Sequence, residues 1–322
     1  MATASISSRV GREYTRVGIW NVRTLRNKEE EVIEEMKKYR LSVLGVSETH
    51  LKGCGEKEIG DAVMVYSGVA EGRAKGGVAL IIAGEMRDCL KEWQCVSERP
   101  VKAQILFKKK WTTFIQVYAP TEDSEKEEND RFYASLEGVL EKVKKDDRLV
   151  LMGDLNGRVG RDVETWEEVI GRHGEDTQND NGRRFLGTCA TNGMTIMNGC
   201  FEHKDIHKYT WECRGRGLRT IINYFAVRKA LRQTVADVKV IRGAEAGSDH
   251  YLVLMKVNLR WTRRKKEVRN EGTRLRLRKL LDWGERVRFQ TELGKLFEKA
   301  IATVWVKMSK RCGRISKGQS WK

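Results

Sequence analysis

The chain has 322 residues, 40% of them hydrophobic, which is enough for one large core or two modest ones. Two prolines argue against a Pro-rich linker, and no apolar run approaches the roughly 18 residues of a transmembrane helix. The seven cysteines are scattered and contain no CxxC pair, which favours a reducing, intracellular compartment and excludes a zinc knuckle.

The net charge of +17 is unevenly distributed along the chain. Residues 261–322 hold 19 Lys and Arg against 6 Asp and Glu, a charge of 19 − 6 = +13, so residues 1–260 carry 17 − 13 = +4. A strongly basic tail on a mildly basic body indicates a polyanionic partner, most often nucleic acid. The alternative is that the tail only improves solubility.

In chain order, the pattern begins with a short polar stretch, 1–12, that we expect to be disordered, and continues into a domain over 13–260. Helices are predicted where apolar residues recur at helical spacing among charged ones, at Lys28–Tyr39, Asn129–Lys145 and Asn181–Asn192. Apolar, β-branched runs predict strands at Leu41–Ser47, Gly77–Ile82, Val101–Phe107, Thr113–Tyr118, Arg148–Met152, Thr195–Met197, Lys208–Glu212, Thr220–Val227, Ala236–Ile241 and Tyr251–Leu259. Many strands and few long helices, not in strict alternation, favour two packed sheets flanked by helices.

The composition changes sharply at 260–266, whose sequence is RWTRRKK. Residues 261–322 are predicted to be a basic tail or the remnant of a linker, helical over Thr273–Lys310. Its basic residues would attract phosphate without reading a base sequence.

Five short segments share one property: each is an apolar strand or run that ends in polar residues able to bind a metal ion. They are Val17–Asn21, Val46–His50, Val117–Pro120, Met152–Asn156 and Gly247–His250. Strand ends are where a rigid sheet can direct side chains toward one cleft. Carboxylates there are rarely structural, because burying them unpaired is costly.

Taken singly, these residues have ordinary explanations. An Asp after a strand, such as Asp154, is often a turn residue or a helix cap, and Tyr118 alone is more often a packed aromatic. The adjacent carboxylate and imidazole of Asp249 and His250 are more specific, because together they suit metal binding and proton transfer. The combination is far more specific than any member.

These motifs, in this order and at these spacings, resemble the endonuclease/exonuclease/phosphatase superfamily. The stretches Trp20–Leu25, Asn179–Phe185, His207–Trp211 and Ser248–His250 are similar, more narrowly, to the endonuclease domain of RTE-type LINE retrotransposons and to host proteins of the craniofacial development protein 2 type. The resemblance covers about 16–260. It implies an α+β fold, the four-layer α/β sandwich of the DNase I-like type, and hydrolysis of a phosphodiester in DNA that leaves a 3′-hydroxyl.

The resemblance also assigns roles on the metal side of the site. Glu48 matches the main carboxylate ligand of a divalent ion, and Asn21 and Asp249 match residues close to that ion. Magnesium, with manganese as an alternative, suits such oxygen ligands. The ion would neutralise the phosphate and the departing 3′-oxygen.

On the side of the attacking water, Asp154 matches the residue that orients or deprotonates the water, and Asn156 a donor to a phosphate oxygen. Tyr118 matches a phenol at the phosphate, and His250 the imidazole that steadies developing charge. The resemblance further implies that Thr210 and Trp211 lie along the DNA backbone.

One position departs from the pattern in a way that bears on catalysis. Residues Thr220–Tyr224 read TIINY, where the family carries an Asp in place of Asn223. That Asp accepts a proton from the ring matched by His250 and favours its charged form. Asn223 keeps the size and loses the charge, which predicts severely impaired activity, unless the metal ion carries most of the electrostatic work.

A second departure is Arg23, which stands where apurinic-site repair nucleases carry an Asp and therefore fits the retrotransposon branch. Four functions stay open: an active or weakened DNA endonuclease, a catalytically crippled nuclease fold that binds nucleic acid or protein, a lipid phosphodiesterase of the same fold, and a decayed retrotransposon copy. DNA is the expected partner, no membrane is expected, and a nuclear location follows only from the DNA interpretation.

Overall fold

The structure is a computed structural model that describes residues 14–107, 109–145 and 147–259, and in the tail residues 284, 287–288, 290–295 and 298. The chain divides into two units, Met1–Arg263 and Arg264–Lys322. The described residues of the second unit are helical. The predictions for 1–12 and for most of the helix at Thr273–Lys310 lie outside the described residues.

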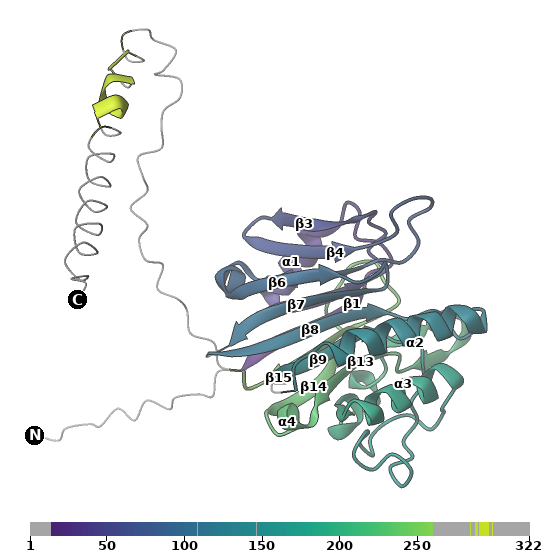
Figure 1. The fold of residues 1–322 in the computed structure, drawn as a ribbon. Coiled ribbons are helices and arrows are strands. Elements are labelled where there is room, and N and C mark those ends of the chain that lie inside the picture. Colours follow the sequence, from purple (N-terminus) through teal and green to yellow (C-terminus); the bar gives the residue numbers. More distant parts are fainter. Residues whose placement is uncertain are drawn as a thin grey trace, which may run out of the picture. The chain divides into compact units, whose positions relative to one another are not determined.

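The first unit is built on two mixed sheets (Figure 1). The seven-stranded sheet has the order β14 (Val235–Ile241), β15 (Leu252–Val257), β1 (Thr15–Asn21), β2 (Val43–Ser47), β5 (Val78–Ile82), β4 (Ala62–Ser67) and β3 (Cys54–Ile59). The six-stranded sheet has the order β10 (Met194–Ile196), β13 (Asn223–Arg228), β9 (Arg148–Asp154), β8 (Lys110–Tyr118), β7 (Pro100–Phe107) and β6 (Leu90–Cys95). A small hairpin pairs β11 (Trp211–Cys213) with β12 (Leu218–Thr220).

The sheets pack face to face, and helices cover their outer faces. Between the sheets lies an apolar cluster that includes Ile19, Met152 and Phe225, all fully buried. Burying a side chain of this size contributes about 2 kcal/mol each. Helices α2 (Lys126–Glu141) and α3 (Asp180–Thr191) pack on the six-stranded sheet, and α1 (Glu29–Lys38) packs on the other. The predicted α+β architecture of two sheets flanked by helices is therefore confirmed.

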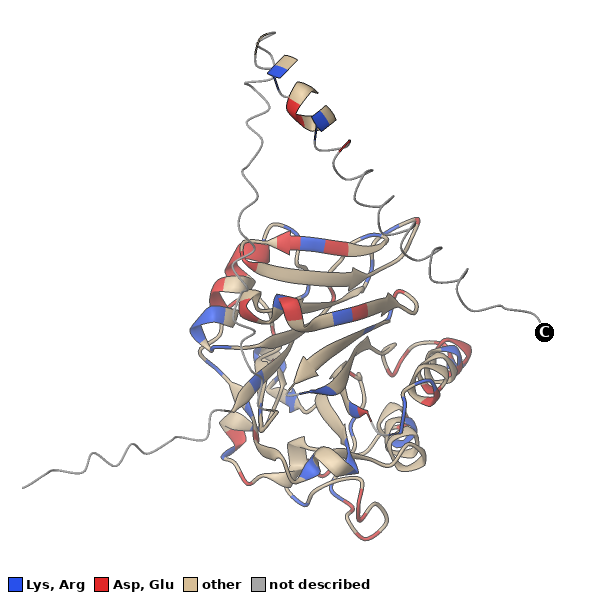
Figure 2. Cartoon of the chain, turned by 60° about the vertical axis from the view of Figure 1, so that its left-hand side comes forward, with Lys and Arg blue, Asp and Glu red and all other residues tan. Residues whose placement is uncertain are grey.

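Charge is distributed as this layering requires. The inner strands are almost free of charged residues, whereas the edge strand β3 and the outer helices carry several each (Figure 2). Helix α1 shows why it forms where it does: Val32, Ile33 and Met36 are buried, three glutamates occupy its first turn and two lysines its last. Those charges complement the helix dipole.

Several predicted strands differ from the structure in their bounds. The predicted strand Lys208–Glu212 starts three residues too early, because residues 208–210 are turn and irregular structure and β11 begins at Trp211. The predicted strand Thr220–Val227 is divided between β12 and β13. Strands β3, β4 and β6 were not predicted. Since β3 and β6 are exposed edge strands rich in Glu and Lys, neither shows the apolar run by which buried strands are detected.

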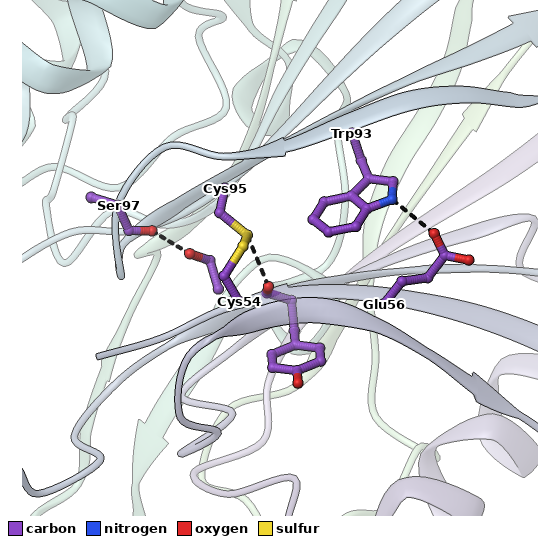
Figure 3. Close-up of a disulfide and its surroundings, with 7 residues drawn as sticks. Cys54, Glu56, Trp93, Cys95 and Ser97 are labelled. Atoms are coloured by element: carbon purple, nitrogen blue, oxygen red, sulfur yellow. Dashed lines mark hydrogen bonds between the residues drawn. A yellow bond between two sulfur atoms is a disulfide. The ribbon is translucent and has the colours of Figure 1, made fainter. Parts of the chain in front are cut away.

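A disulfide between Cys54 and Cys95 joins these two edge strands, one from each sheet (Figure 3). The indole of Trp93 donates to a carboxylate oxygen of Glu56 at 2.8 Å beside it. Two of the seven cysteines are therefore paired in the structure, and the reducing compartment stays a prediction. The sequence does not reveal the pair because its members are 41 residues apart and meet only when the sheets stack.

Candidate active site

Strand direction brings four of the predicted segments to one edge of the sandwich. Strands β1 and β2 are parallel and pair Asn21 with Ser47, the residue before Glu48. Strands β8 and β9 are also parallel and pair Tyr118 with Asp154. Because parallel strands end at the same edge of a sheet, these polar ends meet where the sheets face each other.

The amide of Asn21 bridges two carboxylates. Its Nδ2 donates to Oε1 of Glu48 at 2.7 Å and to Oδ2 of Asp154 at 2.9 Å, and the residue is fully buried. Its Oδ1 accepts from the backbone N–H of Arg23 at 3.0 Å. Asn21 was predicted to lie close to the metal ion. In this arrangement, both sides of its amide are engaged with protein atoms, so it positions the carboxylates.

Glu48 is held from a second side by Tyr118, whose hydroxyl donates to Oε1 at 3.0 Å. Burial, together with the nearby charges of Glu48 and Asp154, raises the pKa of Tyr118 above its ordinary value, so the phenol stays neutral and acts as a donor. The backbone of Glu48 is left-handed, with φ of 54°, which is uncommon outside glycine and is concentrated at functional sites.

Asp154 ends β9 in a fully buried position. Burial raises its pKa, while His250, Asn21 and the N–H of Asn156 oppose that shift by favouring the charged form. The glycine that precedes Asp154 is required for steric reasons. Gly153 has φ of +147°, and a Cβ there would lie 2.0 Å from the carbonyl oxygen of Val117. Only glycine lets β9 approach β8 at this point.

Asn156 turns the chain away from β9 with φ of 44°. Its backbone N–H donates to Oδ1 of Asp154 at 3.0 Å, and its side-chain Nδ2 donates to the carbonyl of Ala119 at 2.9 Å. The amide has one further N–H, so the predicted role as a donor to phosphate stays a prediction.

His250 faces Asn223 across the sheets. Its Nδ1 lies 3.0 Å from Oδ1 of Asn223 and 3.6 Å from Oδ2 of Asp154. Asn223 and Asp154 are direct neighbours in the pairing of β13 with β9. The other amide atom of Asn223, Nδ2, is buried and has no hydrogen-bond partner among the described residues. An unpaired buried donor of this kind costs about 1–3 kcal/mol.

The loop before β15 carries the last motif, Ser248–His250. The Ser248 hydroxyl donates to the carbonyl of Asn21 at 2.7 Å and accepts from the N–H of His250 at 3.1 Å. Oδ2 of Asp249 accepts from the indole of Trp211 at 3.0 Å. Its Oδ1 is buried and has no hydrogen-bond partner in the part of the chain that the structure describes.

Thr210 differs from its predicted place along DNA. Its side chain is fully buried, and its Oγ1 accepts from the backbone N–H groups of Ile222 at 2.9 Å and of Asn223 at 3.1 Å. It therefore holds the start of β13 in place and does not face a ligand. Trp211 is half-buried and stays beside the site through Asp249.

Further positioning residues were not identified from the sequence. Glu175 is buried and accepts from Arg158, from the Thr220 hydroxyl at 2.9 Å and from the N–H of Ile221 at 3.0 Å. Nδ2 of Asn181 donates to the carbonyl of Asn156 at 3.2 Å. From the sequence alone, Glu175 in a loop and Asn181 near the start of a helix resemble ordinary surface residues. Only the folded contacts show that they brace the site.

The donor set can be compared with the needs of a divalent cation. Within 14–107, 109–145, 147–259 and the described tail residues there is no cluster of three His, Cys, Asp or Glu side chains able to hold a metal ion. Glu48 is half-buried, and Oδ1 of Asp249 is an acceptor without a donor. Such a set fits a hard cation held through one or two carboxylates and several waters, as Mg²⁺ prefers.

Comparisons with known proteins address the sequence and the fold. No family model matches the chain. Craniofacial development protein 2 from Bos taurus is 34% identical over 245 residues, which are 76% of this chain and 41% of that protein. The chain thus spans less than half the length of this curated relative.

Among solved structures, the endonuclease domain of TRAS1, a telomere-specific non-LTR retrotransposon, has a TM-score of 0.56 at 15% identity, covering 77% of this chain and 99% of that one. The 3′ phosphatase NExo (D146N) from Neisseria, bound to a product DNA hairpin, has a TM-score of 0.57 at 18% identity, covering 76% and 99%. At these identities the likeness shows the fold. In the described part of this chain, no helix is long and apolar enough to cross a membrane.

Proposed function

We propose that this chain, which has the DNase I-like fold of the endonuclease/exonuclease/phosphatase superfamily and is similar in sequence to craniofacial development protein 2, is a divalent-metal-dependent DNA endonuclease domain of the retrotransposon type whose turnover is strongly reduced by Asn223. One observation carries the proposal. Asn21 joins Glu48 to Asp154 by hydrogen bonds of 2.7 and 2.9 Å, with Tyr118 on one side and His250 on the other.

The proposed division of labour follows from these contacts. Glu48, with Asp249 nearby in the site, would hold Mg²⁺ or Mn²⁺, which supplies charge neutralisation at the phosphate. Asp154 faces the site from the end of β9 and would orient a water and accept its proton. Tyr118 and His250 would act as donors to phosphate oxygens. Phosphoryl transfer depends on such positioned charge more than on covalent chemistry.

The reduced turnover rests on the His250–Asn223 contact of 3.0 Å. A neutral amide oxygen accepts from Nδ1–H, but it stabilises an imidazolium less than a carboxylate does. The same replacement of Asp by Asn behind the histidine of a serine-protease triad lowers the rate by about 10⁴, which sets a scale for another chemistry. Asp154, 3.6 Å from the same nitrogen, offsets part of the loss.

The experiment is nicking of supercoiled plasmid with Mg²⁺ and with Mn²⁺ by the full chain, with Asp154→Ala as the matched inactive variant. We expect slow nicking that EDTA stops and that Asp154→Ala lacks. Cutting by the purified chain that persists in EDTA or in Asp154→Ala would not depend on this site and would contradict the proposal.

Asn223 itself favours a second candidate: a catalytically crippled nuclease fold that binds nucleic acid. A gel shift of duplex DNA together with no cutting under either metal ion would select it. In both cases we propose DNA as the partner, with the basic residues 261–322 adding salt-sensitive affinity. Absence of any DNA binding would instead favour a phosphodiesterase acting on a lipid.

A further inference from the structure

The Cys54–Cys95 disulfide lies at the same edge of the sandwich as the candidate active site. In the seven-stranded sheet, β3 runs antiparallel to β2, so Cys54 begins β3 at the edge where Ser47 ends β2. In the six-stranded sheet, β6 runs parallel to β8, so Cys95 ends β6 at the edge where Tyr118 ends β8. The bond therefore joins the two sheets along the edge that carries the polar strand ends.

Two short segments connect the cysteines to the pair formed by Glu48 and Tyr118. Cys54 comes six residues after Glu48. Cys95 comes four residues before Arg99, whose carbonyl accepts from the N–H of Tyr118 at 3.0 Å and whose guanidinium donates to the Tyr118 carbonyl at 3.2 Å. The Tyr118 hydroxyl donates to Glu48 at 3.0 Å. The disulfide therefore closes a ring of covalent and hydrogen bonds that contains the Glu48–Tyr118 contact.

Two further contacts join the same edges without the disulfide (Figure 3). Oγ of Ser67, which ends β4, donates to the carbonyl of Ser97 at 2.5 Å. The Trp93 indole on β6 donates to Glu56 on β3 at 2.8 Å. Because these hydrogen bonds do not involve sulfur, they hold the edge strands together in either redox state.

The bond is accessible to thiols in solution. Cys54 is exposed and Cys95 is half-buried. Exposed disulfides are the labile ones, because a thiolate can reach one of the two sulfur atoms. Sγ of Cys95 lies 3.2 Å from the carbonyl oxygen of Tyr66, so the thiol that reduction leaves there has an acceptor in place.

We propose that Cys54–Cys95 is a reversible thiol-exchange site that sets how firmly Glu48 is held, an inference that rests on the proposed function and adds redox control to it. A small thiolate of the glutathione class attacks Sγ of Cys54 and forms a mixed disulfide. The Cys54–Cys95 bond breaks, and Cys95 leaves as a thiolate that takes a proton from water.

A second small thiolate attacks the mixed disulfide and releases Cys54, which takes a proton in turn. The small-molecule disulfide leaves. The protein cystine is reduced to two thiols, and two small thiols are oxidised to one disulfide. The reverse sequence, with a small disulfide as oxidant, closes the bond again.

Reduction opens the ring at one covalent bond. Residues 48–54 and 95–99 then lose their link to each other, while the edge strands stay together. Glu48 keeps the hydrogen bond from Tyr118, but both partners are held less rigidly. A carboxylate that is less well oriented by its neighbours binds a metal ion more weakly.

The test equilibrates the full chain in glutathione buffers of graded redox ratio and then alkylates free thiols for mass spectrometry. We expect Cys54 and Cys95 to become alkylated together as the buffer becomes more reducing, with an unchanged far-UV circular dichroism spectrum. Hydrogen–deuterium exchange of residues 48–54 and 95–99 should be faster in the reduced form. The Mg²⁺ affinity measured by titration calorimetry should be about tenfold lower in that form.

Two variants serve as controls. The double variant Cys54→Ser, Cys95→Ser should show the amide exchange and Mg²⁺ affinity of reduced wild type in every buffer. Cys213→Ser, which removes a free thiol, should respond to the buffer as wild type does.

If Cys54 and Cys95 stay unpaired in the most oxidising buffer, or if both segments exchange equally fast in the two forms, the inference fails while the proposed function stands. Faster amide exchange with unchanged Mg²⁺ affinity would also overturn it, because the bond would then brace only the edge strands. If oxidised wild type binds no Mg²⁺, the proposed function fails and takes the inference with it.

Discussion

Oδ1 of Asn223 lies 3.0 Å from Nδ1 of His250, so the histidine keeps an acceptor at position 223, but this acceptor carries no negative charge. Asn223 lies where a carboxylate partner of His250 would lie, but its neutral amide cannot stabilise a positive charge on the imidazole as a carboxylate does. Nδ2 of Asn223, buried without a partner among the described residues, shows the same mismatch from the other side, because a carboxylate would place no N–H there.

Asn223→Asp should raise the metal-dependent nicking rate by about 10²-fold or more, because a carboxylate favours the imidazolium and fixes the tautomer. The measurement is the initial rate of plasmid nicking at saturating Mg²⁺. Asn223→Ala is the control; it removes the acceptor and should fall below wild type. Equal, robust nicking by wild type and Asn223→Asp would contradict the idea that residue 223 limits the rate.

Glu48→Gln should weaken Mg²⁺ binding by at least about tenfold, since it removes a carboxylate charge while its amide oxygen can still accept from Asn21 and Tyr118. Titration calorimetry measures this without any dependence on turnover. Glu92→Gln, on the exposed edge strand β6, is the matched control. Unchanged affinity in Glu48→Gln would place the ion elsewhere.

The buried carboxyl group of Asp154 should make the free energy of unfolding depend on pH. Burial raises its folded-state pKa above the ordinary value of 3.8. The sign follows from proton binding: the folded state holds the proton more tightly, so this group stabilises the fold fully below 3.8, and the contribution is lost as pH rises through the folded pKa. In EDTA, the free energy of unfolding of wild type relative to Asp154→Asn should therefore fall as pH rises and then level off. A difference that is flat or rises with pH would contradict the buried-acid assignment.

Cys95→Ser should lower stability under oxidising conditions by about 3–4 kcal/mol, because the bond to Cys54 closes a loop of 41 residues in the unfolded chain. Thermal unfolding with and without a reductant measures it, and the variant should lose the sensitivity to reductant that wild type shows. Cys213→Ser, a free half-buried thiol, should keep that sensitivity. Wild type that unfolds at one temperature in both conditions would show that the bond does not form.

Much of the core was predictable because most buried strands and amphipathic helices show an apolar pattern, although the buried apolar strand β4 was missed. Lys28–Tyr39 differs from α1 by one residue at each end, and Arg148–Met152 falls within β9. The edge strands β3 and β6 show no such apolar pattern, because most of their side chains are polar or charged and face water. The hairpin at Trp211–Thr220 was misplaced because its strands are three residues each, too short for a period to show.

The site was predictable as a set of strand ends and not as a set of contacts. Asn21 and Asp154 meet because strands pair in parallel within each sheet and because the two sheets stack. A local sequence pattern reveals neither the strand pairing nor the stacking of the sheets. Thr210 shows the limit: its motif predicted a DNA contact, yet its hydroxyl is used by two backbone N–H groups. Only the fold decides whether a polar side chain near a cleft faces outward.

The intact support around position 223 has a genetic consequence. The Thr210 hydroxyl accepts from the N–H groups of Ile222 and Asn223, and His250 faces the amide oxygen, so these neighbours hold residue 223 in a position that an Asp of the same size could take. Codons for Asn and Asp differ by a single nucleotide. One nucleotide transition therefore separates this chain from a variant with a carboxylate at position 223, and that variant can keep the same neighbouring contacts.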